Sequence, residues 1–187
     1  MADSSEIRPD FADVAVAHWE RERPDLDFTA MATLARFARL HIAGSRRVDA
    51  VFADHGLDRG EFDVLAGLRR TGAPHEMPPS QLAEILLITR AGMTKRVDRL
   101  EARGLVTRRA DPEDRRSLRI GLTPEGTALV DAAVTEHAAN ENRLLSLLTE
   151  DEARAFDAIL RKLLAAVDEH PPEPTRPGTV RASQPDT

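Results

Sequence analysis

Residues 88–104, ITRAGMTKRVDRLEARG, decide the fold because they read as one short helix with two different faces. Met93, Val97 and Leu100 recur at helical spacing, so they predict the face that packs against a core. Arg96 lies beside this apolar face. A guanidinium at the edge of a buried face needs either a carboxylate partner or a bound anion. The helix therefore carries a candidate binding feature as well as a packing face.

The flanking sequence predicts further helices and one pair of strands. Asp58 with Glu61, and Thr149 with Glu152, form capping boxes, and Ser80 is expected to cap a short helix. Two apolar stripes mark the N-terminal helices, one with Phe11, Val14, Ala15 and His18, the other with Leu34, Phe37, Leu40 and Val48. The predicted helices span residues 10–22, 28–55, 58–70, 81–87, 89–103, 125–148 and 150–170. The predicted strands span residues 105–109 and 118–122, with ADPEDRRS as the turn between them.

This order predicts a mainly α-helical fold with a small β wing, a winged helix-turn-helix. The flanking helices carry more apolar surface than so small a module can cover, so a homodimer is expected. The predicted organisation is a disordered N-terminus (1–9), N-terminal helices (10–57), a DNA-binding region (58–123), C-terminal dimerisation helices (124–170) and a disordered Pro-rich tail (171–187).

Composition narrows the possible environments and partners. The 187 residues include no cysteine, which excludes disulfides and thiolate metal sites. No apolar run reaches the roughly 20 residues of a membrane span, and MADSSEIRPD lacks the apolar core of a secretory signal, so a cytoplasmic protein is expected. The net charge is −6, yet residues 78–120 hold ten Lys/Arg against six Asp/Glu. This basic island fits a local nucleic-acid footprint, although a solvated surface of mixed charge would look the same.

An enzyme is the main competing class, and the sequence does not favour it. The six histidines are scattered without metal-ligand spacing, and there is no phosphate-binding glycine loop and no G-x-S-x-G motif. Neither a metal nor another cofactor is expected. A second alternative is a helical interaction protein that has lost DNA binding, but the basic residues of the helix and the turn argue against it.

The run LAEILLITRAGMTKRVDRLEARGLVTRRADPEDRRSLRIGLTPEG resembles the MarR family of bacterial transcriptional regulators. The D-P-x-D-R-R turn and the following L-T-x-x-G are the specific parts, and the similarity extends over about residues 30–168. The resemblance implies a winged helix-turn-helix homodimer that binds a palindromic operator in double-stranded DNA. Most members repress, and a small ligand releases them.

The candidate DNA contacts lie on the two helices of the reading head and on the wing. Arg90 can read guanine edges, while Thr and Lys side chains can fix the register on phosphates. Asp111 and Asp114 can pair with arginines and hold the turn, so that an arginine projects from its tip into a minor groove. The predicted contacts are Ser80, Gln81, Thr89, Arg90, Thr94, Lys95, Arg115 and Arg116. An ordinary N-cap for Ser80, and a solvated turn for the wing, are the alternatives.

An additional N-terminal helix makes the sequence similar to the urate-responsive, PecS/HucR-like subgroup of that family. The resemblance places the effector-binding residues at Trp19, Asp63, Arg96 and Arg108. Asp63 and Arg96 are expected to form a partly buried ion pair, and Trp19 offers a flat face for a planar anion. Such an anion would bind the arginines, repel Asp63 and shift the recognition helix.

Other interpretations of these four residues remain open. Trp19 can simply pack, the Asp63–Arg96 pair can be structural, and Arg108 can contact a phosphate. A small polycarboxylate could use the two arginines without Trp19, and a phenolic compound is a further alternative to urate.

Overall fold

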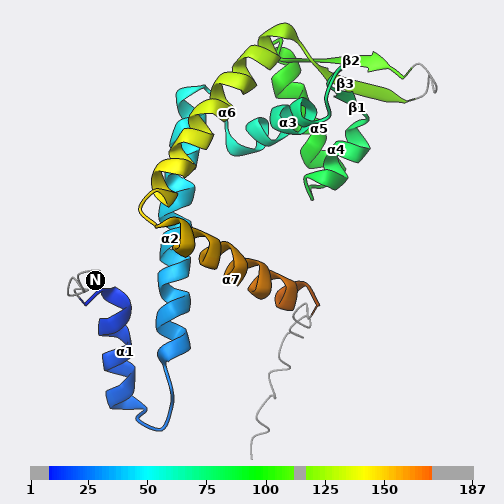
Figure 1. The fold of residues 1–187 in the computed structure, drawn as a ribbon. Helices are drawn as coiled ribbons and strands as arrows, with labels where there is room; N and C mark the ends of the chain where they lie inside the picture. The colour runs from blue at the N-terminus through cyan, green and yellow to red at the C-terminus, as the bar shows by residue number, and fades with distance from the viewer. Residues whose placement is uncertain (1–8, 112–116, 170–187) are drawn as a thin grey trace, which may run out of the picture. The chain divides into compact units, whose positions relative to one another are not determined.

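The computed structural model describes residues 9–111 and 117–169, and its helices follow the predicted order (Figure 1). The helices are α1 (Phe11–Glu22), α2 (Thr29–Asp54), α3 (Arg59–Arg70), α4 (Pro79–Ile85), α5 (Arg90–Ala102), α6 (Pro124–Leu145) and α7 (Glu150–Glu169). The strands are β1 (Glu76–Met77), β2 (Val106–Ala110) and β3 (Leu118–Leu122). The prediction of a mainly α-helical fold with a small β wing is confirmed.

The chain divides into two compact units, which are described separately. The first unit ends at Glu141 and contains α1 to α5, the sheet and most of α6. The second begins at Asn142 and contains the end of α6 and all of α7. The apolar side chains of α7 are exposed in the single chain, as Ile159 and Leu164 illustrate.

Local capping signals set the helix starts around the reading head. Asp58 accepts a hydrogen bond from the backbone N–H of Glu61, and Glu61 caps in return, so this capping box is confirmed. Thr89 caps α5 by accepting from the N–H of Gly92. Gly104 ends the α5 region with a φ of 70°, a left-handed conformation that favours glycine.

Ser80 does not cap α4, contrary to the prediction. The helix begins at Pro79, and Pro78 occupies the N-cap position without a side-chain hydrogen bond. Proline suits the first helical position because its φ is preset and it has no N–H to satisfy there. Ser80 therefore lies within the first turn, where its side chain is exposed.

The wing has a third strand that was not predicted. β2 and β3 pair antiparallel, with Val106 opposite Leu122, as expected for the hairpin. β1 adds on the other side of β3, which gives the order β1–β3–β2. Two residues within a Gly/Pro-rich loop carry no alternating pattern, so the sequence offered no signal for β1.

The core of the first unit joins the end of α2 to α3, α4, α5, the sheet and the start of α6. Met93, Val97 and Leu100 are each no more than 1% exposed, which confirms the predicted inner face of α5. Phe52 at the end of α2 stacks on Phe62 of α3, with ring centroids 4.0 Å apart. This cluster fixes α5 against its neighbours and leaves its other face free.

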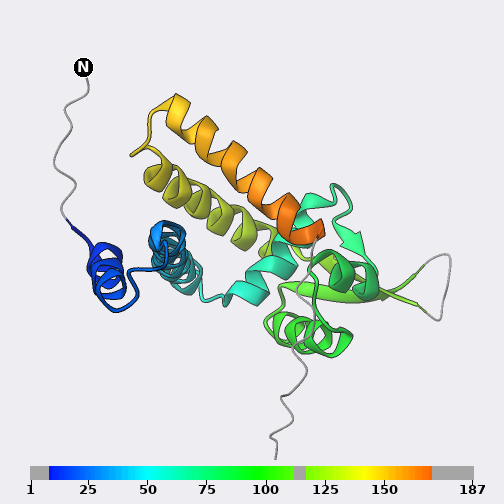
Figure 2. The same ribbon diagram turned by 90° about the horizontal axis from the view of Figure 1, so that it is seen from below.

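The two apolar stripes of the N-terminal helices are largely exposed in the single chain, in line with the expectation that these helices carry more apolar surface than one chain covers. α1 lies beside α2 (Figures 1 and 2), yet Phe11 is 68% exposed. On α2, Leu34, Phe37 and Leu40 also remain exposed, while Val48 packs against the core. The reason is that α1 covers only one side of α2, so the stripe of α2 has no partner among the described residues.

The ends of the last two helices differ slightly from the prediction. α6 ends at Leu145, three residues earlier than expected, and Thr149 then caps α7 through the predicted capping box with Glu152. The predictions of disorder for both termini concern residues outside the described ranges, apart from the exposed Pro9.

Candidate nucleic-acid interface

The outer face of α5 presents the polar and basic residues predicted to meet DNA. Thr89, Arg90, Thr94 and Lys95 are all exposed. The hydroxyl of Thr94 donates to the backbone carbonyl of Arg90 at 3.0 Å. Neither Arg90 nor Lys95 has a side-chain hydrogen bond or ion pair with any described residue, so both charges are available to a polyanion.

A hollow of about 360 Å³ joins the starts of α4 and α5 to the base of the wing. Its lining includes Ser80 from α4, Arg90 and Thr94 from α5, and Leu118 from β3. Three predicted DNA contacts from two helices therefore lie around one concave surface. Gln81 is exposed next to Ser80, outside the lining of this hollow.

The base of the wing is held by a hydrogen-bonded acidic residue. Asp111 is 7% exposed, and the Nε of Arg119 donates to its carboxylate at 2.7 Å. The N–H of Asp111 also donates to the carbonyl of Ser117, which closes the two strands. The predicted pairing of Asp111 with an arginine is confirmed. Asp114, Arg115 and Arg116 lie outside the described residues.

A buried carboxylate that sequence reasoning missed links α3 to α5. Glu61 is 6% exposed and accepts from Arg99 at 2.9 Å and from Arg103 at 3.2 Å. Arg99 also donates to Asp58 at 2.8 Å, and its hydrogen bond with Glu61 raises its pKa. The four-residue spacing of the two arginines was the available signal, because it places both on one side of α5.

Asp63 and Arg96 do not form the predicted ion pair. Both side chains are half-buried, but no ion pair joins them among the residues that the structure describes. The guanidinium of Arg96 instead lies over Gly60, one turn earlier on α3. Burial raises the pKa of Asp63, although the positive charges of Arg59 and Arg96 oppose that shift. The two groups therefore interact electrostatically across the α3–α5 interface without a direct contact.

Arg108 is already paired with carboxylates of the recognition helix. Its guanidinium donates to Asp98 and to Glu101, both on α5, while Arg108 itself lies on β2. Although burial opposes the change, these two carboxylates raise the pKa of Arg108. An anion that uses Arg108 has to compete with both partners.

Trp19 is not brought together with the other three predicted effector residues in a single chain. Its ring stacks on Phe28, with centroids 5.9 Å apart, just before the start of α2. Phe28 and Phe52 are 24 residues apart, which corresponds to roughly 36 Å at the rise of an α-helix. Since Phe52 packs against α3, Trp19 lies at the far end of α2 from Asp63.

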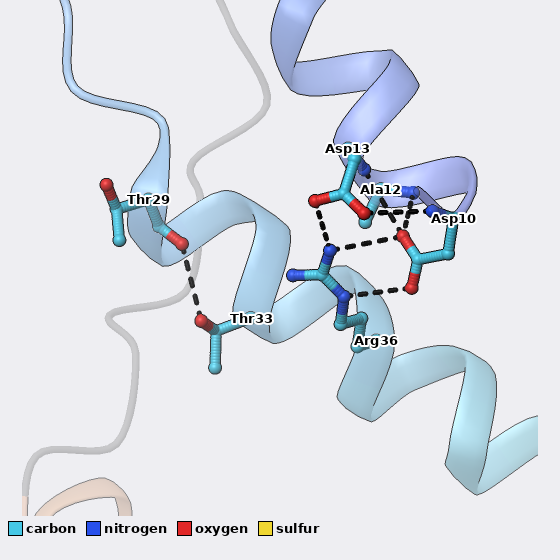
Figure 3. Close-up of polar contacts among 6 residues, drawn as sticks. All are labelled: Asp10, Ala12, Asp13, Thr29, Thr33 and Arg36. Atoms are coloured by element: carbon cyan, nitrogen blue, oxygen red, sulfur yellow. Dashed lines mark hydrogen bonds and ion pairs between the residues drawn. The ribbon is translucent and has the colours of Figure 1, made fainter. Parts of the chain in front are cut away.

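An ion-pair cluster holds α1 on α2 (Figure 3). Arg36 of α2 donates to Asp10 at 2.9 Å and to Asp13, the two residues of the α1 capping box. The hydrogen bond from Arg36 is the largest cause of a lowered pKa at Asp10, which falls to about 2. We call Asp10, Asp13 and Arg36 the α1 clamp.

The described residues lack the features of a metal site and of a membrane-spanning helix. No cluster of His, Asp or Glu among them could hold a metal ion. None of their helices is long and apolar enough to cross a bilayer. A helix-turn-helix with a wing, a free basic face on its second helix and a concave surface beside it together define a DNA-binding protein.

Comparisons with known proteins place this fold in a family. A family model described as the MarR family matches residues 55–117. The chain is 42% identical over 155 residues to the HTH-type transcriptional regulator PecS of Dickeya dadantii, which covers 83% of this chain and 91% of PecS. The chain therefore belongs to the MarR family of DNA-binding transcriptional regulators, and its similarity to PecS supports the PecS-like subgroup.

Solved structures agree on the fold. Sco5413, a MarR family regulator from Streptomyces coelicolor, superposes with a TM-score of 0.61 at 27% identity, covering 77% of this chain and 99% of that one. The C80S mutant of Escherichia coli MarR, complexed with operator DNA, has a TM-score of 0.61 at 24% identity, covering 73% of this chain and 97% of that one. These relatives are regulators and not enzymes.

Proposed function

We propose that the protein is a repressor that binds a palindromic operator as a homodimer and is released by a small planar anion such as urate. The observation that carries the proposal is the arrangement around α5. Its outer face offers unpaired Arg90 and Lys95 to DNA, while its inner edge carries Arg96 within electrostatic reach of the half-buried Asp63. One helix therefore connects a DNA surface to a charged interface.

The dimer is proposed because exposed apolar residues need a partner. Phe37 and Leu40 on α2, and Ile159 and Leu163 on α7, are each about half exposed in the single chain. Pairing the N- and C-terminal helices of two copies would bury these side chains and set two reading heads on one face of a duplex.

Release by the effector would act through α5. A planar anion that binds Arg96 draws the guanidinium away from Gly60 and repels the carboxylate of Asp63. Since α5 packs on α3 through Met93, Val97 and Leu100, a change at this interface alters how α5 meets the groove. A coupling of about 1–3 kcal/mol is typical of such linked sites.

The structure narrows the roles of the other two effector residues. Arg108 is expected to contribute only if the anion displaces Asp98 or Glu101. Trp19 is expected to contribute through a second copy or a rearranged α1, because α2 separates it from Arg96 within one chain. A small polycarboxylate or a phenolic compound would use Arg96 alone or with Arg108.

The test is a titration of labelled duplex DNA from the region upstream of the protein's own gene, monitored by fluorescence anisotropy. We expect sub-micromolar binding of that duplex, weaker binding of a scrambled duplex, and release by urate but not by uncharged uracil. Arg90→Ala should weaken operator binding by about 1–3 kcal/mol. Equal binding of both duplexes would refute the operator, and binding insensitive to urate would refute the effector.

A further inference from the structure

The glycine at position 60 is not explained by its backbone. Gly60 is the second residue of α3 and does not have a positive φ, unlike Gly56, Gly72 and Gly104. Glycine is less favourable than alanine within a helix. A residue with ordinary helical geometry and a poor helix propensity indicates that the space of the missing side chain is used.

That space is filled by Arg96. A Cβ atom on residue 60 would lie 2.5 Å from Nε, 2.6 Å from Cζ and 2.8 Å from Nη2 of Arg96. Contacts below 3.0 Å are not tolerated, so one of the two groups would have to move. The clashing atoms belong to the end of a flexible side chain, so the guanidinium would move and the helix would remain.

The contact with Gly60 is also what holds Arg96 in place. Neighbouring arginines are tied by ion pairs, as Arg99 and Arg103 are to Glu61. Arg96 has no hydrogen bond or ion pair with any other residue in the ranges described. Its guanidinium is therefore positioned by packing on the bare backbone of α3, and its N–H donors remain unused.

We propose that Gly60 is a positioning residue of the effector site, an inference that rests on the proposed function. The missing side chain seats the Arg96 guanidinium between α3 and α5, within electrostatic reach of Asp63 but not paired with it. In this position the donors of Arg96 are free for an anion. A side chain at position 60 would push the guanidinium out of the interface. An anion bound to Arg96 would then no longer change the position of α5 on DNA.

The experiment compares Gly60→Ala with Arg46→Ala in the full-length protein. Arg46 is the control because its side chain is exposed on α2 and faces away from the apolar stripe of that helix. The urate concentration that releases half of the bound operator is measured for each variant, relative to that variant's own DNA affinity. We expect at least a tenfold increase for Gly60→Ala and no change for Arg46→Ala.

The double variant Gly60→Ala/Arg96→Ala distinguishes positioning of Arg96 by Gly60 from a general structural effect of the substitution. With Arg96 truncated to alanine, Gly60→Ala should cause no further loss of urate response and should raise the Tm, because alanine is more favourable than glycine in a helix. With Arg96 intact, the gain in Tm should be smaller or absent. An unchanged urate response in Gly60→Ala, or the same loss with and without Arg96, would overturn the proposal.

The thermal measurements also decide the matter if urate is not the effector. If the wild-type protein does not respond to urate, the proposed effector is refuted. The Tm values of the wild type, Gly60→Ala, Arg96→Ala and the double variant still report on the contact between residues 60 and 96. Non-additive changes in Tm for the two substitutions would show that Gly60 positions Arg96. Additive changes in Tm would refute that positioning role as well.

Discussion

The charged residues on α5 differ in their partners according to the direction in which each side chain points. Arg90 and Lys95 face outward without partners, Arg99 is tied to the buried Glu61, and Arg96 rests on Gly60. Burial explains the contrast, because a buried carboxylate needs its hydrogen bonds whereas an exposed lysine is solvated by water. The same short helix thus holds one arginine with a structural ion pair, two unpaired cations proposed to meet DNA and one arginine proposed to bind the effector.

Glu61→Gln tests whether the ion pairs of Glu61 with Arg99 and Arg103 stabilise the fold. Removing the charge weakens the bonds from Arg99 and Arg103 in a site that is only 6% exposed, so we expect a loss of about 1–3 kcal/mol in the free energy of unfolding. Urea denaturation followed by circular dichroism measures it. Glu84→Gln is the control, since Glu84 is exposed on α4 and should change stability by less than about 0.5 kcal/mol. Equal losses would show that the Glu61 ion pairs add nothing to stability.

At the scale of elements, α1 buries little of its apolar surface against α2. Ala12 is the one buried residue of α1, and the α1 clamp and the Trp19–Phe28 stack add polar and aromatic contacts. Most of its apolar surface is exposed. The attachment of α1 should therefore respond to changes in charge that leave the core intact.

Acid is expected to release α1 late. The pKa of Asp10 is about 2 in the folded state against an ordinary 3.8, so its contribution is present above pH 3.8 and is lost as the pH falls through about 2. Trp19 is the only tryptophan, and its fluorescence reports the stack on Phe28. The wild-type signal should hold from neutral pH down to about pH 4 and change toward pH 2.

Variants of single arginines identify the cause of that acid transition. Arg36→Ala should alter the fluorescence of Trp19 already at neutral pH and abolish the change between about pH 4 and pH 2. Arg23→Ala is the control, because Arg23 pairs with Asp25 in the loop after α1 and not with the clamp. A transition that persists in Arg36→Ala would assign it to groups outside the clamp.

For the whole molecule, the exposed apolar stripe of α2 and the basic face of α5 indicate two kinds of association. The stripe needs another protein surface, whereas the basic face needs a polyanion. A chain with a net charge of −6 can still bind DNA because its positive charge is concentrated between residues 78 and 120. Each association has its own test.

Phe37→Asp should convert the proposed dimer to monomers. A carboxylate in the middle of an apolar interface loses its hydration without gaining a partner, which costs several kcal/mol. Sedimentation velocity at micromolar concentration measures the oligomeric state. Arg46→Asp is the control, because residue 46 is nine positions further along α2 and faces the opposite side. A dimer that survives Phe37→Asp would place the interface elsewhere.

Operator affinity should fall steeply with salt. Each phosphate contact releases counterions, so the logarithm of the association constant should decrease with the logarithm of salt concentration by about 0.9 per contact. Lys95→Ala should reduce the slope by about one such contact, since Lys95 is exposed and unpaired. A slope near zero in the wild-type protein would argue against the basic face as the DNA surface.

The sequence by itself determined the order of the helices, the inner face of α5 and the hairpin. These features depend on local periodicity and capping, as the Asp58–Glu61 capping box and the spacing of Met93, Val97 and Leu100 illustrate. Such signals are read over one or two helical turns, so they survive without knowledge of the neighbours.

Only the tertiary structure decided which charges meet. The sequence predicted a pair between Asp63 and Arg96, yet the carboxylate that pairs with arginines between α3 and α5 is Glu61, and Arg96 packs on Gly60 instead. Residues 60, 61 and 63 face different directions around α3, and the packing of α5 selects among them. The separation of Trp19 from Arg96 is also a tertiary fact, because the length and direction of α2 set it.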